Sequence, residues 1–145
     1  MGGHLGYWLA ALWNVFSFRE SIFEIRADEA VISEHFLLVI INNSSRTGGG
    51  FMVSPKASVS DGMLDMILCK PLPVWKRLFA MPVIQKGKHL DRPFIHFRQH
   101  KTVTVRCAKE MPAALDGELL IAKSFEIKVL PGCLHFRYLS KEERD

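Results

Sequence analysis

Several features that would place a protein in a familiar class are missing from this sequence. It has no run of lysines or arginines, no low-complexity segment, no internal repeat and no linker. The formal net charge is +4, from 19 basic and 15 acidic residues, and the basic residues are spread along the chain. This mild excess favours an anionic partner or surface but excludes a basic nucleic-acid-binding tail. A length of 145 residues predicts one domain with its own core.

Cysteine is sparse and does not form a metal or disulfide pattern. Cys69, Cys107 and Cys133 lie far apart, and no CxxC motif or Cys/His cluster occurs. An odd number of scattered cysteines is typical of reduced thiols in a cytosolic protein. We therefore expect three buried, unpaired cysteines and a cytoplasmic location.

Common catalytic and metal-binding arrangements are also missing. His89, His96 and His100 are each isolated from a metal-ligand spacing, so we expect surface or hydrogen-bonded core histidines. The three glycines Gly48 to Gly50 are followed by neither a lysine nor a helix start, which excludes a phosphate-binding P-loop. No Ser/His/Asp arrangement stands out.

The longest apolar stretch is too short to cross a bilayer. It runs from Leu5 to Phe16, whereas a spanning helix needs ~20 residues. It lacks a basic leader and a small-residue cleavage site, so it does not resemble a signal peptide. Its helical spacing predicts a helix over about Gly6 to Val15, with the aromatic side packed in the core.

The rest of the chain is dominated by short apolar or alternating runs that predict strands. A single further helix is expected over 74–84, ended or kinked by Pro82 and closed by Gly87. Nine or so short strands and two helices indicate a mainly β fold, a largely antiparallel β-sandwich with helical insertions. The expected strands are 22–26, 30–33, 35–42, 51–54, 63–70, 94–97, 102–107, 119–122, 125–130 and 134–138.

One stretch, Asn43 to Asp65, contains an unusual number of glycine, proline and turn residues. It holds Gly48 to Gly50, then Pro55, then the turn Asp61-Gly62, all between two apolar runs. Two tight connections between strands of a sheet would explain this pattern, and so would a functional site that needs a particular backbone shape. At Asp61 the carboxylate and neighbouring carbonyls could together bind a hard cation, although an ordinary hairpin turn is the simpler alternative. Asp65 lies in the following apolar run, so its carboxylate needs a partner if that face is buried.

A second acidic turn is Leu115-Asp-Gly-Glu-Leu119. Asp116-Gly117 is typical of a hairpin. Glu118 is less expected, because it would be the first residue of a strand. A carboxylate held at this point could accept a proton from a substrate hydroxyl.

An ordered set of motifs resembles the C-terminal half of a known family. Asn43 is followed by Gly48 to Gly50, and the later motifs are Pro55-x-Ala57, Ser60-Asp-Gly-x-Leu-Asp65, Gly87-x-His89, Leu115-Asp-Gly-Glu118 and Leu130-Pro-Gly132. Together they resemble the diacylglycerol kinase-like bacterial lipid kinases, which include YegS-type and sphingosine kinase-related enzymes. Each motif alone is weak, but seven in the right order are specific. The resemblance extends from the first helix to about Tyr138.

The resemblance implies a two-domain enzyme that transfers the γ-phosphate of ATP to a lipid hydroxyl, such as that of diacylglycerol or a related lipid alcohol. It implies a β-sandwich C-terminal domain, with the active site between the two domains. The proton acceptor then falls on Glu118, with Asp116 beside it. A structural Mg²⁺ site falls on the carboxylate of Asp61 and the main-chain carbonyls of Ser58 and Met63.

One element of the resembled family does not occur in these residues. The family's N-terminal domain carries a Gly-Gly-Asp-Gly-Thr nucleotide-binding segment, and nothing similar is present here. Phosphoryl transfer depends mainly on positioning and neutralising phosphates. We therefore expect a single C-terminal domain over 1–145 that is inactive without a nucleotide-binding domain, supplied in cis or in trans. The alternative is a non-catalytic remnant that binds a lipid surface or a protein, and peripheral contact with the inner membrane surface fits either hypothesis.

Overall fold

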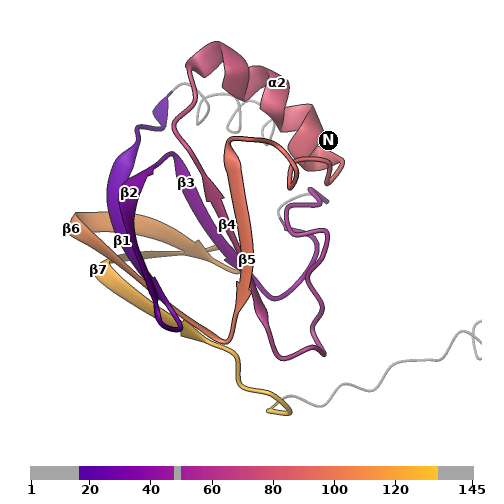
Figure 1. The fold of residues 1–145 in the computed structure, drawn as a ribbon, viewed down its shortest axis with the longest axis vertical. Coiled ribbons are helices and arrows are strands. Elements are labelled where there is room, and N and C mark those ends of the chain that lie inside the picture. Colours follow the sequence, from indigo (N-terminus) through magenta and orange to yellow (C-terminus); the bar gives the residue numbers. More distant parts are fainter. Residues whose placement is uncertain (1–16, 48–49, 134–145) are drawn as a thin grey trace, which may run out of the picture.

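The computed structural model describes residues 17–47 and 50–133, which form two antiparallel sheets and one helix (Figure 1). The expected helix at 6–15 and the expected strand at 134–138 lie outside the described residues. The four-stranded sheet has the order β2-β1-β6-β7, and the three-stranded sheet has the order β3-β4-β5. The strands are β1 (Ser21–Ala27), β2 (Ala30–Phe36), β3 (Leu38–Asn42), β4 (Leu64–Cys69), β5 (Ile95–His100), β6 (Thr102–Leu115) and β7 (Glu118–Lys128).

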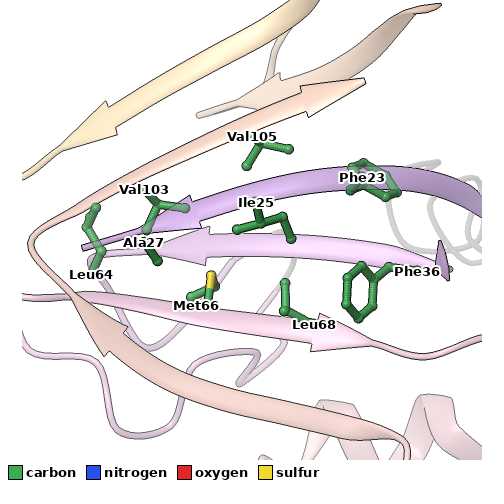
Figure 2. Close-up of a cluster of buried hydrophobic side chains, with 9 residues drawn as sticks. All are labelled: Phe23, Ile25, Ala27, Phe36, Leu64, Met66, Leu68, Val103 and Val105. Atoms are coloured by element: carbon green, nitrogen blue, oxygen red, sulfur yellow. The ribbon is translucent and has the colours of Figure 1, made fainter. Parts of the chain in front are cut away.

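The main core lies between the two sheets, as the predicted β-sandwich requires. Strand β1 alternates as its sequence indicates: Phe23 and Ile25 are buried, whereas Arg26 is exposed. From the other sheet, Met66 and Leu68 of β4 meet them (Figure 2). The mainly β, antiparallel fold class is therefore confirmed.

Strand β4 is buried at all six positions, so it is covered on both faces. Its second face carries Ile67 and Cys69, which pack with Val53, Leu72 and Ile95. The cover comes from the segment after β3 and from the helix α2 (Val74–Gln85), which lies above the three-stranded sheet in Figure 1.

Helix α2 matches the predicted helix, with one difference at its end. It continues through Pro82 to Gln85, so the proline does not end it. Gly87 closes the helix as expected: its φ is +68°, and its N–H donates to the Ile84 carbonyl at 2.9 Å. Among the residues that the structure describes, no helix is long and apolar enough to cross a membrane.

The predicted strand at 35–42 is wrong in one respect, because it is two strands. The chain leaves the four-stranded sheet after Phe36 and enters the other sheet at Leu38. Between them, the Leu37 N–H donates to the Cys69 carbonyl at 2.8 Å. One continuous apolar run thus supplies residues to both sheets, so the sequence gives no sign that the strand ends at Phe36 and a new one begins at Leu38.

The predicted strand at 51–54 is also wrong. Only Phe51 pairs, through an isolated bridge to Thr47. The Met52 N–H donates to the Gln85 carbonyl and the Ser54 N–H to the Ser45 carbonyl. The segment's backbone therefore bonds to the end of α2 and to its own loop, rather than to a strand.

The segments expected at 102–107, 119–122 and 125–130 form one long hairpin. Strand β6 has 14 residues and β7 has 11, with an irregular register between Arg106 and Met111. The bulge interrupts the period-two pattern, which is why the sequence suggested shorter strands.

The three cysteines are free thiols, and their burial differs. Cys69 is buried as predicted, and burial raises its pKa to about 11. Cys107 is half-buried, and Cys133 is exposed, so the expectation of three buried cysteines is wrong for Cys133.

Candidate functional site

The Asp116-Gly117 turn joins β6 to β7 at the tip of the long hairpin. Asp116 has a φ of +48° and Gly117 one of +95°, as a tight two-residue hairpin turn demands. Leu115 and Glu118 form the last pair of the ladder. Both Asp116 and Glu118 are exposed. The hairpin interpretation is correct, and it places two accessible carboxylates at one tip.

The second acidic turn is held by the side chain of Asp61. Its Oδ1 accepts a 2.9 Å hydrogen bond from the Met63 N–H, and Gly62 has a φ of +69°. The hydroxyls of Ser58 and Ser60 lie 3.1 Å apart on the same connection. This local bond leaves Oδ2 of the exposed Asp61 available to a ligand.

An open depression of about 470 Å³ lies beside Asp61. Its lining includes Lys101 and Lys128, one just before β6 and the other at the end of β7. Pro131 lines it too, so the structure brings the Ser60-Asp-Gly motif next to the Leu130-Pro-Gly motif, two elements separated widely in the sequence. Because two lysines and one aspartate line the depression, the net positive charge of its lining favours anions.

The expected Mg²⁺ ligands do not include a dense cluster of acidic side chains. Asp61 offers a carboxylate oxygen, and Ser58 and Met63 offer main-chain carbonyls. Mg²⁺ commonly takes one or two carboxylates and keeps several waters. In the part of the chain that the structure describes, no group of three or more His, Cys, Asp or Glu side chains could hold a metal. Any ion here would depend on main-chain oxygens and water.

The two predicted sites lie at opposite ends of strand β6. Thr102 begins the strand and lines the depression beside Asp61, whereas Leu115 ends it next to the acidic tip. At ~3.3 Å per residue, these 14 residues extend roughly 40 Å along the strand. A cation at Asp61 and a substrate held by Glu118 would therefore lie at opposite ends of this strand.

Asp65 is a buried carboxylate that sequence reasoning singled out without finding its partner. It is 1% exposed, and its Oδ1 accepts a 2.8 Å hydrogen bond from Gln99 Nε2. Burial raises its pKa above the ordinary value, although the bond from Gln99 opposes this. Its neighbour across the β3–β4 ladder is Asn42. Asp65 Oδ2 and Asn42 Nδ2 are both buried and have no hydrogen-bond partner among the described residues.

The Gly87-x-His89 motif holds the segment after the glycine run in place. The buried His89 lies with Nε2 2.8 Å from the Val53 carbonyl, so Nε2 carries the proton and donates. Burial lowers the pKa of His89. At Gly87, a Cβ would lie 2.9 Å from Met52 Sδ and 3.2 Å from Pro55 Cβ. A side chain at position 87 would therefore require Met52 and Pro55 to shift.

His96 and His100 also behave as predicted, one as a surface histidine and the other as a hydrogen-bonded one. His96 is exposed. His100 Nδ1 lies 2.8 Å from Asp28 Oδ2, on the turn between β1 and β2.

Residues 1–137 match a family model described as the YegS C-terminal NAD kinase β-sandwich-like domain. Because the match covers nearly the whole chain, the protein belongs to this family. The chain is also similar to a YegS-like lipid kinase of Shewanella frigidimarina, with 27% identity over 90% of this chain and 42% of that protein. It is 28% identical to a diacylglycerol kinase of Mycobacterium tuberculosis, over 91% of this chain and 43% of the relative. The chain thus spans about two fifths of the relatives it matches.

Solved structures have the same fold. A diacylglycerol kinase of Bacillus anthracis Sterne superposes with a TM-score of 0.64 at 20% identity, over 83% of this chain and 43% of the other. A second structure from that strain has a TM-score of 0.71 at 24% identity, covering 90% of this chain and 43% of the other. At these identities the likeness extends to the fold alone.

Proposed function

We propose that this domain supplies the acceptor side of an ATP-dependent lipid kinase of the diacylglycerol kinase type. The observation that carries the proposal is the tip of the β6–β7 hairpin, where the carboxylates of Asp116 and Glu118 are exposed on a tight turn. The family and the named relatives support a lipid hydroxyl as the acceptor. ATP would be the co-substrate, bound mainly by a nucleotide-binding domain in the same polypeptide or in a separate one.

In this proposal Glu118 is the general base. Its carboxylate takes the proton of the lipid hydroxyl while that oxygen attacks the γ-phosphorus of ATP. The bond between the γ-phosphorus and the bridging oxygen breaks, and ADP leaves. Asp116 lies two residues earlier on the same turn and is exposed beside it.

The expected Mg²⁺ site has a structural role in this proposal. Asp61, with the carbonyls of Ser58 and Met63, would hold the ion, which would neutralise the carboxylate and fix the turn. The length of β6 separates this site from Glu118, which supports a structural rather than a catalytic ion.

The test joins this chain to the part of the Bacillus subtilis diacylglycerol kinase that lies outside the matched segment. Transfer of labelled phosphate from ATP to diacylglycerol is then measured. Glu118→Gln should lower the rate by about 10²- to 10⁴-fold and leave the unfolding curve unchanged. Glu126→Gln, also exposed on β7, is the matched control. Undiminished transfer by Glu118→Gln would remove this residue from the role.

A second candidate function is binding to a lipid surface without catalysis. One observation favours it: α2 exposes Trp75 (59%) and Phe79 (72%), and Lys76 Nζ lies 5.3 Å from the Trp75 ring centroid. Aromatic side chains beside a cation suit an anionic membrane interface. This function predicts sedimentation with anionic vesicles that Glu118→Gln does not change. If the chain sediments with neither anionic nor neutral vesicles, the surface role is wrong.

A further inference from the structure

Helix α2 and the segment that follows it account for the whole net charge of this chain. Residues 74–92 contain five basic residues and one acidic residue, a net charge of +4. The whole chain also has a formal net charge of +4, so the remaining 14 basic and 14 acidic residues balance. The excess positive charge is therefore concentrated on one short segment, which should attract an anionic surface.

Four of these five cations are available to a partner. The exception is Arg77, which is buried and bonds to Glu20 and to two backbone carbonyls. The others are exposed and form no ion pair within the described ranges 17–47 and 50–133; they are Lys76, Lys86, Lys88 and Arg92. Because no carboxylate there pairs with them, their charge acts on whatever lies outside α2.

Large apolar side chains accompany these cations on the outer side of α2. Trp75 and Phe79 are four residues apart, which places them on the same side of the helix, and both are exposed. Arg77 and Ala80, on the inner side, are buried. In Figure 1, α2 lies outside the three-stranded sheet, so the side that is not buried faces outward. Exposed rings gathered in one place indicate an interaction surface.

A depression of about 360 Å³ brings the two kinds of side chain together. Its lining combines three aromatic rings with two cations, namely Trp75, Phe79, Phe94, Lys76 and Arg92. Lys76 Nζ lies 5.3 Å from the centroid of the Trp75 ring, so a cation and a ring are in contact. Apolar walls beside two cations match an anionic phospholipid, whose phosphate lies next to apolar acyl chains. We call Trp75, Lys76, Phe79 and Arg92 the docking face.

We propose that the docking face binds the surface of an anionic lipid bilayer and holds the domain against it during catalysis. The inference rests on the proposed function, because an acceptor lipid lies in a membrane that the kinase must reach. Aromatic rings are favoured at the boundary between headgroups and acyl chains. Each lysine or arginine near an anionic membrane strengthens binding by about fivefold.

A second copy of this chain fits the docking face less well than a bilayer does. In a symmetric dimer the same patch of each subunit meets at the interface. Lys76 and Arg92 of the two copies would then lie close together, and such like-charge contacts disfavour association. An anionic bilayer instead offers the opposite charge together with an apolar interior.

The test measures how the full chain sediments with vesicles of mixed phosphatidylglycerol and phosphatidylcholine, and with vesicles of phosphatidylcholine alone. The wild-type protein should bind the anionic vesicles more strongly. Lys76→Gln combined with Arg92→Gln should weaken that binding by about 25-fold, because two cations are lost. Phe79→Ser should weaken it by about tenfold, because one ring no longer inserts.

Matched controls make the same kinds of change elsewhere on the surface. Lys109→Gln combined with Lys123→Gln removes two exposed cations from the β6–β7 hairpin. Val31→Ser removes an exposed apolar side chain from β2. Both should bind anionic vesicles within about twofold of the wild-type protein, because charges far from the bilayer are screened by salt. Urea unfolding of all variants checks that each is folded.

Three results would overturn the proposal. The first is sedimentation that is no stronger with anionic than with neutral vesicles. The second is an equal loss of binding in the double variants at Lys76 and Arg92 and at Lys109 and Lys123, which would make net charge the cause. The third is dimerisation that grows with protein concentration and is abolished by Phe79→Ser, which would make a second copy the partner.

Vesicle binding requires neither ATP nor a base, so the two proposals can fail separately. In the protein joined to the Bacillus subtilis segment, the double variant at Lys76 and Arg92 should slow transfer to diacylglycerol in anionic vesicles. It should not slow transfer to dioctanoylglycerol in non-ionic detergent micelles, whereas Glu118→Gln should slow both. Binding by the docking face with undiminished transfer by Glu118→Gln would retain the face and remove the base. Lost transfer by Glu118→Gln with normal vesicle binding by the docking-face variants would do the reverse.

Discussion

Gln99 donates a 2.8 Å hydrogen bond from Nε2 to Oδ1 of Asp65, although 34 residues separate the two in the chain. The register of β4 and β5 places them directly opposite one another. This bond satisfies one oxygen of a carboxylate that is almost fully buried, while Oδ2 has no partner in the described part of the chain. The Gln99 amide therefore supplies the hydrogen bond that partly offsets the burial of this carboxylate.

Removing that amide should destabilise the fold. Gln99→Ala would leave a buried carboxylate without its donor, which costs about 1–3 kcal/mol in the free energy of unfolding. Urea unfolding followed by circular dichroism measures it, with His96→Ala, an exposed change on the same strand, as the control. In the Asp65→Asn background the cost of Gln99→Ala should be smaller, because no charge is stranded. Equal stability of Gln99→Ala and His96→Ala would contradict the role of this bond.

His89 should make the stability depend on pH. Burial lowers its pKa in the folded state below the ordinary value of 6.5. The unfolded chain then binds the proton more readily, so the free energy of unfolding is highest above pH 6.5 and falls as the pH drops toward the folded-state pKa.

His89→Gln should remove this contribution, because the amide can still donate to the Val53 carbonyl but does not titrate. Unfolding at about pH 7.5 and about pH 5.5 gives the two free energies. His96→Gln, at an exposed position, should keep the wild-type difference between them. The prediction is wrong if His89→Gln loses as much stability on acidification as the wild-type protein.

Gly87→Ala should be more harmful than an alanine at another left-handed glycine. The new Cβ would meet Met52 and Pro55 at 2.9 and 3.2 Å, and the φ of +68° would also be strained. Gly117→Ala is the matched control, because its φ is +95° and a Cβ there meets nothing within 4 Å. We expect Gly87→Ala to lower the free energy of unfolding by about 1–3 kcal/mol more than Gly117→Ala. Equal losses would mean that Met52 and Pro55 move aside freely.

Asp61→Asn should abolish stabilisation by Mg²⁺. The amide oxygen can still accept from the Met63 N–H, so the turn survives while the ligand charge is lost. Thermal unfolding with and without MgCl₂ should show a rise in Tm for the wild-type protein and none for Asp61→Asn. Asp91→Asn, also an exposed aspartate, is the control and should keep the rise. An unchanged rise in Asp61→Asn would rule out the site.

Local features of the sequence predicted those parts of the fold that depend on nearby residues. The alternation around Phe23 and Ile25 follows from the two-residue period of a strand. The turn at Asp116-Gly117 follows from residues that tolerate a positive φ. The same period placed Asp65 opposite Leu64 and Met66, on a face that proved to be buried.

The features that were missed depend on distant pairing. No local pattern assigns Gln99 to Asp65, because the bond requires the β4–β5 register. The separation of Asp61 from Glu118 could not be predicted, because the sequence did not indicate that β6 continues as one strand through its bulge. Gly87 and His89 were recognised as a motif, but their contacts with Met52 and Val53 are set by tertiary packing.

Arg77 of α2 links parts of the molecule that sheet pairing leaves separate. Its Nε donates to the Leu72 carbonyl and its Nη1 to the Phe18 carbonyl, both at 2.7 Å. Its Nη2 lies 3.2 Å from Glu20 Oε1, on the segment that leads into β1. The helix that covers one sheet is therefore linked to the segment that leads into β1 of the other sheet. Because the two sheets also share the main core, they should unfold in a single cooperative transition, and loss of Arg77 should chiefly speed amide hydrogen exchange in α2.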